Sequence, residues 1–416
     1  MRFIRHLVGG FRGLPAPIWA IFTLQIITRG GDFVFPFLTL FLTRKLGLSS
    51  IEAGFWVMAT VASGLLGTMA AGKLSDHFGR RRILGLCLLG GCMFTGLCGF
   101  LPATIIISKT LLIASFFQGS IKPILSAFVM DLCEPQQRKE GFSLSYLGTN
   151  LGVAVGPMIA GFLFENHLHW VFFGNSLAMV CAIGILIWFV PESRSSQLIP
   201  EAGPEQGAAG SALSALMKRP LLVSFFIITL FVSFAYDQTS FGLTLYTSRI
   251  FGARGAANFG FLMSFNAAVV LVSTALITRF TARMSGALAM ALGTGFYTIG
   301  FSMLAFRLDM RLLLISTLIW TTGEVLLAIN SGAYLASQTP WNFRGRFQAF
   351  REIVWSAGRI LSPMAYGTII AHAGIHLSWV VTALVALTCT GGFVLLHQWE
   401  RKGLAQGFTG IQGEVP

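Results

Sequence analysis

The stretch Gly72-Lys-Leu-Ser-Asp76-His-Phe-Gly79-Arg80-Arg81-Arg82 lies between two apolar runs that are each long enough to cross a membrane. Gly72 would permit a close approach of helices, and Gly79 would allow a tight turn. Asp76 sits where the start of a helix favours an anion. The three arginines would hold the loop at one membrane face and could reach acidic partners such as Asp131. The pattern predicts a charged hairpin between two membrane-spanning helices.

The rest of the chain is also apolar. Hydrophobic residues make up 54% of its 416 residues and charged residues 11%, against about 25% charged in soluble domains. So much apolar surface indicates an all-α polytopic membrane protein. The net charge of +13 does not indicate a nucleic-acid partner, because the basic residues lie at the ends of apolar runs and form no basic patch interleaved with aromatic side chains.

Apolar runs of about 20 residues predict 12 transmembrane helices, six on each side of one polar, Pro- and Gly-containing segment. The predicted domains are an N-terminal six-helix bundle (1–190), a cytoplasmic linker (191–220), a C-terminal six-helix bundle (221–396) and a cytoplasmic tail (397–416). Lys and Arg concentrate in alternate loops, which predicts a protein of the cell membrane with both termini cytoplasmic. The predicted spans are 16–42, 52–73, 83–102, 105–130, 142–164, 170–190, 221–246, 258–278, 286–306, 311–335, 348–371 and 377–396.

The two halves repeat each other. Asp32-x5-Leu38-Thr-Leu-Phe41-x2-Arg44-x2-Gly47 is matched by Asp237-x5-Leu243-Thr-Leu-Tyr246-x2-Arg249-x2-Gly252, at an offset of 205 residues. Gly152-x4-Pro157-Met-x2-Gly161 is matched by Gly358-x4-Pro363-Met-x2-Gly367, at an offset of 206. Matches in register indicate duplication. Parallel repeats of six spans predict a substrate site at their interface, near the membrane midplane.

The loop at 72–82 resembles the cytoplasmic signature loop of the major facilitator superfamily, Gly-x3-Asp-x2-Gly followed by basic residues. The resemblance implies the major facilitator fold, two pseudo-symmetric six-helix bundles. It also implies that the loop latches the halves in an outward-open state and releases them as they rock. The alternative is that the arginines only fix the topology. The implied latch residues are Gly72, Asp76, Gly79, Arg80, Arg81 and Asp131.

Two further stretches resemble signatures of the family. Gly152-Val-Ala-Val-Gly156-Pro157-Met-Ile-Ala-Gly161 resembles one of the drug/proton antiporter branch, with Ala160 replacing a glycine; generic helix packing is the alternative. Ser115-Phe-Phe-Gln118-Gly119 resembles Arg-x2-Gln-Gly, but Ser115 replaces the arginine. Lys122, seven positions later, either substitutes for that arginine or extends to the lipid headgroups.

Ionisable side chains inside the predicted spans are expected to be functional, because each costs about 2.5–3.5 kcal/mol to insert. Arg29 and Asp32 are three residues apart and would share one helix face. Gly323-Glu324 resembles the Gly-Glu of proton-coupled multidrug exporters, and a carboxyl group in a low-dielectric site can carry a proton. The candidate proton-coupling residues are Asp32, Glu324 and Asp237, with the first two favoured. Since three bases lie at similar depth, a structural role for some of these acids stays open.

The predicted central cavity combines amide and aromatic side chains with few charges, which suits amphiphilic organic molecules. The six cysteines show no metal-like pairing, and the outer-loop histidines lie beside tryptophans, so no metal site is expected. No P-loop or catalytic triad is present, so an enzyme is not expected. The candidate cavity residues are Gln25, Arg29, Phe33, Gln118, Lys122, Asn150, Tyr236, Gln238, Asn266, Trp355 and Arg359.

These features predict a secondary active transporter that exports small organic or amphiphilic compounds by proton antiport and alternating access. A proton gradient would supply the energy, without a cofactor. The expected partners are a small-molecule substrate, protons and the lipid bilayer, with no nucleic acid, and the chain is expected to be a monomer. The alternatives are a proton symporter or facilitator for a polar solute or metal chelate (metallophore), and a membrane sensor that does not transport.

Overall fold

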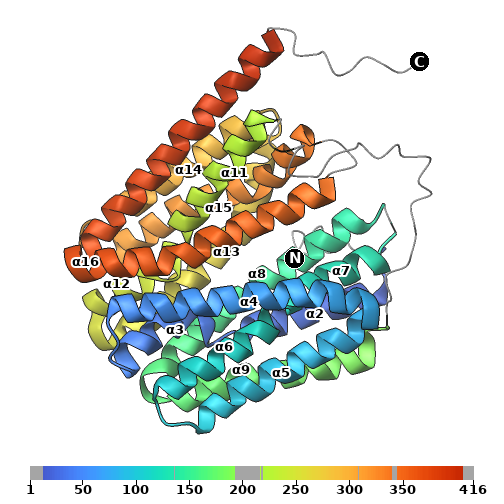
Figure 1. The fold of residues 1–416 in the computed structure, drawn as a ribbon, viewed down its shortest axis with the longest axis vertical. Helices are drawn as coiled ribbons and strands as arrows, with labels where there is room; N and C mark the ends of the chain where they lie inside the picture. Colours follow the sequence, from blue (N-terminus) through green and yellow to red (C-terminus); the bar gives the residue numbers. More distant parts are fainter. Residues whose placement is uncertain are drawn as a thin grey trace. The chain divides into compact units, whose positions relative to one another are not determined.

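The computed structural model describes residues 13–134, 136–192, 216, 219–307, 309–339 and 344–405. The described residues form helices and turns without any strand, so the chain is all-α as predicted (Figure 1). Parts of all four predicted domains lie outside the described residues: 1–12 and 135 of the N-terminal bundle, 193–215 and 217–218 of the linker, 308 and 340–343 of the C-terminal bundle, and 406–416 of the tail.

The first of two compact units contains Met1–Glu205 and Ser240–Leu271. Helix α2 packs against α8 and α9, α5 packs against α6 and α9, and α4 packs against α6. A core of apolar side chains from α2, α5, α7 and α9 is fully buried between them. The elements of this unit are α2 (Ala16–Gly30), η1 (Phe35–Phe37), α3 (Leu38–Leu40), η2 (Phe41–Lys45), α4 (Ser50–Phe78), α5 (Arg80–Phe100), α6 (Ile105–Gly119), α7 (Ile121–Leu132), α8 (Arg138–Asn166), α9 (Leu168–Phe189), α12 (Gly242–Phe251), η4 (Gly252–Arg254) and the first part of α13 (Gly255–Thr281).

The second unit contains Gln206–Thr239 and Val272–Pro416. Helix α14 packs against α15 and α16, and α11 packs against α16. Aromatic rings fill its core: the centroid of Phe301 lies 6.2 Å from that of Trp320 and 5.8 Å from that of Trp379. Its elements are α11 (Pro220–Tyr236), η3 (Asp237–Thr239), the end of α13, α14 (Gly286–Met303), α15 (Met310–Gln338) and α16 (Arg344–Ala405).

In the described part of the chain, ten helices are long and apolar enough to cross a membrane, and the chain is a multi-pass membrane protein. Two of them, Pro220–Thr281 and Phe350–Lys402, have 62 and 53 residues and each covers two predicted spans. The first is interrupted by η3 and by Gly252 at φ +54°, and the second by Gly374 at φ +85°. The predicted spans coincide with these helices, and the count of twelve stays a prediction.

The first span is broken, whereas the sequence predicts one helix over 16–42. Helix α2 ends at Gly30, and the chain passes through non-helical residues 31–34 before η1. Gly31 packs against Ala178, where any larger residue would clash, and Pro36 lacks the N–H that a continuous helix needs. Asp32 therefore lies at a helix break.

A second break separates α6 from α7 at Ser120. Pro123 has no N–H to donate to the carbonyl of Gly119, four residues earlier. The hydroxyl of Thr68 on α4 donates to that carbonyl instead, at 2.8 Å. The carbonyl of Gly119, which the proline leaves without its usual helical donor, therefore links the broken span to α4.

Candidate functional site

Arg80 is the centre of the charged turn between α4 and α5. Its side chain is only 7% exposed, and Nε lies 2.6 Å from Oδ2 of Asp131, at the end of α7. A second ion pair, 3.6 Å from Nη2 to Oδ1, joins Arg80 to the exposed Asp76. Arg81, the other arginine assigned to the latch, instead donates from Nη2 to the carbonyl of Ile187 on α9, at 2.6 Å.

The two glycines of this turn differ in what they do. Gly79 has φ +97° and ψ 140°, a conformation open essentially to glycine alone, as the predicted tight turn requires. A Cβ at Gly72 would meet no heavy atom within 4 Å in the described residues. Gly72 therefore does not serve a close helix approach within this unit, and its place in a latch stays a prediction.

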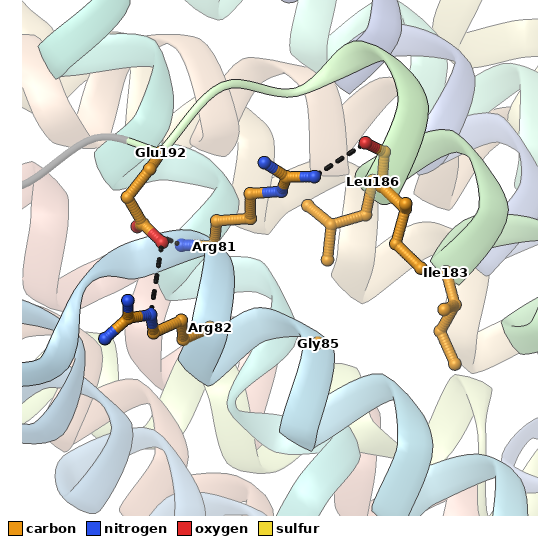
Figure 2. Close-up of a pocket in the computed structure, with 7 residues that line it drawn as sticks. Arg81, Arg82, Gly85, Ile183, Leu186 and Glu192 are labelled. Atoms are coloured by element: carbon orange, nitrogen blue, oxygen red, sulfur yellow. Dashed lines mark hydrogen bonds and ion pairs between the residues drawn. The ribbon is translucent and has the colours of Figure 1, made fainter.

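Glu192 completes the turn, although the sequence assigns it only to the linker. Its Oε1 accepts the main-chain N–H of Arg81 at 3.0 Å, in the first turn of α5 (Figure 2). A carboxylate at that position satisfies an unpaired helix N–H and favours the positive end of the helix dipole. Because Glu192 lies more than a hundred residues from Arg81 along the chain, no local sequence pattern reveals this role.

The glycine motif of α8 contacts two helices. A Cβ at Gly156 would lie 2.6 Å from the carbonyl oxygen of Gly30, and one at Gly152 would lie 2.7 Å from that of Ile26, both on α2. Further along α8, Pro157 and Gly161 contact the backbone of α13. Small residues let these backbones meet, so the motif packs α8 tightly in this unit.

A polar cluster joins α2 to α8 beside these glycines. Gln25 donates from Nε2 to Oγ of Ser145 at 2.6 Å and accepts at Oε1 from the hydroxyl of Thr149 at 3.1 Å. Asn150, another predicted cavity residue, donates to the carbonyl of Tyr146 on its own helix. The structure therefore uses Gln25 for cross-helix packing in the described arrangement.

Arg29 and Asp32 contact each other only loosely. Nη1 of Arg29 lies 3.9 Å from Oδ2 of Asp32. The other carboxylate oxygen, Oδ1, is buried without a hydrogen-bond partner among the described residues. Because α2 has already ended at Gly30, the contact crosses a helix break; the predicted shared helix face is wrong.

Asp237 is paired more closely. Nε of Arg359, on α16, donates to its Oδ1 at 3.3 Å. Asp237 is only 4% exposed, whereas the arginine side chain is 43% exposed. Beside it, the amide of Gln238 is fully buried and has no hydrogen-bond partner in the described part of the chain. The sequence identifies both charged residues but not that they meet.

An aromatic cluster surrounds Tyr236 in the second unit. Its ring centroid lies 5.9 Å from those of Tyr297 and Trp355 and 6.5 Å from that of Trp320. Glu324 lies one helical turn after Trp320 on α15 and interacts electrostatically with Tyr297. The structure thus places two predicted cavity residues, Tyr236 and Trp355, near the candidate acid Glu324. Tyr297 and Trp320 belong to the same cluster, although the sequence does not assign them to the cavity.

The other predicted cavity residues lie in the first unit. Phe33 is buried against Gly174 of α9, and Gln118 donates to the hydroxyl of Thr95 at 2.9 Å. Ser115, which replaces the family arginine, donates to the carbonyl of Thr60 at 2.7 Å. Lys122 is exposed and Asn266 is buried on α13. A common cavity shared by these residues and those of the second unit stays a prediction.

Comparison with known proteins agrees with this architecture. Residues 20–363 match the family model described as Major Facilitator Superfamily. The chain is 26% identical over 392 residues to the multidrug resistance protein MdtG of Proteus mirabilis, covering 89% of this chain and 91% of the relative. It is 21% identical over 411 residues to a Na(+), Li(+), K(+)/H(+) antiporter of Planococcus maritimus, covering 89% and 93%.

The fold is shared with solved transporters. A crystal structure of a POT family transporter in complex with a thioalcohol-conjugated peptide superposes with a TM-score of 0.78 at 15% identity, over 94% of this chain and 97% of that one. These relatives are transporters, so the prediction that the chain is not an enzyme is confirmed. Since the family match covers most of the sequence, this chain belongs to the major facilitator superfamily of transporters.

Proposed function

We propose that this transporter exports small organic, amphiphilic compounds in exchange for protons, by alternating access of its two repeats. A multidrug resistance protein and a cation/proton antiporter among its relatives support exchange. On this proposal the protein works as a monomer in the cell membrane with both termini cytoplasmic. The proton gradient is the energy source, and no cofactor takes part.

The observation that carries the proposal is the state of Asp32. One of its carboxylate oxygens is buried without a hydrogen-bond partner among the described residues, as is Oδ2 of Asp237, but the arginine beside Asp32, Arg29, is no closer than 3.9 Å. A carboxyl group at a helix break with a loose counter-charge can gain or lose a proton without breaking a strong ion pair. Asp237 is less suited, because Arg359 donates to it directly. We therefore assign proton coupling to Asp32 before Asp237.

The aromatic cluster supports the substrate class. The partly exposed rings of Tyr236 and Trp355 offer apolar area and π-faces, and the buried Trp320 supports Tyr236. Glu324 lies one helical turn after Trp320 on α15. Aromatic faces attract organic cations and bury amphiphilic molecules. Glu324 is the second candidate for proton coupling, since a cation and a proton could compete for its carboxylate.

The test is uptake of the fluorescent lipophilic cation ethidium into proteoliposomes with an acidic interior. We expect uptake that collapses when the pH gradient is dissipated. Asp32→Asn should abolish gradient-driven uptake while exchange of ethidium down its own gradient continues. Asp309→Asn is the matched control: this exposed acid caps α15 through the N–H of Leu312, and asparagine also caps.

Three outcomes would contradict parts of the proposal. Uptake that ignores the pH gradient would favour a facilitator, and uptake only into vesicles with an alkaline interior would favour a symporter. If Asp32→Asn and Glu324→Gln both leave gradient-driven uptake intact, the acids are structural. If ethidium and a panel of polar solutes and metal chelates raise the melting temperature without any flux, the chain is a sensor, since ligands stabilise the state that binds them.

A further inference from the structure

A cavity of about 450 Å³ lies where the beginning of α5 meets the end of α9. Its lining combines charged and apolar groups from these two helices and the residues that follow α9. Figure 2 shows Arg82 and Glu192 on one side and Ile183 and Leu186 on the other, with the guanidinium of Arg81 extending toward α9 between them. The lining residues are Arg81, Arg82, Gly85, Ile183, Leu186, Ile187 and Glu192.

The charged side carries two guanidinium groups and one carboxylate. Arg81 donates one hydrogen bond from its side chain, to the carbonyl of Ile187. Arg82 is 73% exposed, and its Nε lies 4.0 Å from Oε2 of Glu192. That distance is at the limit of an ion pair, and an exposed pair contributes about 0–1 kcal/mol. The positive charge of Arg82 is therefore only weakly satisfied by the protein.

The apolar side continues onto an exposed apolar surface. Gly85, which carries no side chain, widens the cavity beside Ile183 and Leu186. The neighbouring Trp188 and Phe189 are highly exposed at the end of α9. In a membrane-spanning protein such a surface faces lipid, and aromatic residues at a span end mark the interface with the headgroups. The cavity thus lies where acyl chains meet phosphates.

We propose that this cavity binds an anionic phospholipid, with its phosphate on Arg82 and Arg81 and the upper part of an acyl chain against Gly85, Ile183 and Leu186. Basic pockets between spanning helices at the headgroup level suit acidic lipids. A soluble anion would gain nothing from the aliphatic wall, and the lining, with two arginines against one carboxylate, favours a lipid that carries a net negative charge. Glu192 opposes the phosphate and limits the affinity. This site does not depend on the proposed export.

The test is native mass spectrometry of the purified full-length protein titrated with dioleoyl phosphatidylglycerol. We expect one tightly bound lipid per chain. Arg82→Gln should weaken its binding about fivefold, the effect of one basic residue near a charged surface. Glu192→Gln keeps an acceptor for the N–H of Arg81 but removes the opposing charge, so it should tighten binding. Gly85→Leu should fill the space beside the aliphatic wall; among the described residues, a Cβ there would have Leu186 alone within 4 Å, at 3.7 Å.

Lys73→Gln is the matched control, because Lys73 is an exposed base near the same turn but outside the cavity lining. An equal loss of affinity in Lys73→Gln, or none in Gly85→Leu, would overturn the proposal in favour of diffuse attraction. So would equal binding of dioleoyl phosphatidylcholine. Displacement of the lipid by millimolar inorganic phosphate would identify a simple anion site instead. A melting temperature close to that of the unmodified protein would show that a variant is folded, so that its change in lipid affinity is not caused by misfolding.

Discussion

Arg359 donates from Nε to Oδ1 of Asp237 across 3.3 Å, joining α16 to the break after α11. The first half of the chain also pairs its aspartate with an arginine, but Arg29 comes from the same segment as Asp32. The counter-charge therefore comes from the aspartate's own segment in the first repeat and from another helix in the second.

Glycine contacts show that the repeats pack alike within each unit. A Cβ at Gly152 would contact the carbonyl of Ile26 and the amide of Gly30, and a Cβ at Gly358 would contact those of Leu230 and Phe234. By this packing Arg29 corresponds to Ser233, and Arg359 lies one residue after the glycine, at the position of Val153. The two repeats therefore carry this arginine on different helices, although in each repeat an arginine lies near the aspartate.

We predict that Asp237 and Arg359 stabilise the protein as a pair. Arg359→Gln should leave a buried carboxylate unpaired and cost about 2–3 kcal/mol, less than the about 3–5 of a fully buried pair, because the arginine is half-buried. Asp237→Asn with Arg359→Gln should recover part of that loss. Urea or thermal unfolding in detergent would measure the free energies of unfolding of the unmodified protein, the two single variants and the double variant. Strictly additive losses would show that the two residues act independently.

The buried pair of Arg80 and Asp131 should contribute more to stability than the exposed contact of Arg80 with Asp76. Asp131→Asn is expected to cost about 3 kcal/mol, the lower end for a buried pair, because the 7%-exposed guanidinium keeps only the more distant carboxylate of Asp76, at 3.6 Å. Asp76→Asn is the comparison, with about 0–1 kcal/mol. Melting temperatures of the two variants would decide. Equal losses would mean that burial does not control the strength of these pairs.

Gly156 should tolerate no side chain. Gly156→Ala would place a Cβ 2.6 Å from a backbone oxygen of α2, which cannot move without shifting the helix. Overpacking of this kind costs about 1–3 kcal/mol. Gly184→Ala on α9 is the control, since no heavy atom of the described residues would lie within 4 Å of its Cβ, and it should be neutral or slightly stabilising. If Gly156→Ala left the free energy of unfolding unchanged, the motif would not be needed to pack α8 against α2.

The turn between α4 and α5 depends on Gly79 and not on Gly72. Gly79→Ala should destabilise by about 1–3 kcal/mol through backbone strain at φ +97°. Its Cβ would also lie 2.7 Å from Oε1 of Glu192. Gly72→Ala should leave the melting temperature unchanged or raise it, because its Cβ is unobstructed. If Gly72→Ala keeps its stability but loses transport, its role lies in the conformational cycle.

Local patterns predict the helices well and their interruptions poorly. Apolar length predicts where the ten long apolar helices of the described chain lie, because burial in lipid depends on the segment itself. The break at residues 31–34 follows from Gly31 packing against Ala178, a contact that no local pattern reveals. Ser115 is similar: the sequence shows a missing arginine, and only the fold shows its bond to Thr60.

The sequence by itself determined that this protein is a helical, multi-pass membrane protein with an internal repeat, because run length, loop charge and repeated motifs are properties of contiguous residues. Its resemblance to a known family added the role of a transporter. Only the tertiary structure decided which charges meet. Asp237 and Arg359 are 122 residues apart, and Arg81 is 111 residues from Glu192. Such pairs are selected by how helices pack, so spacing along the chain cannot specify them.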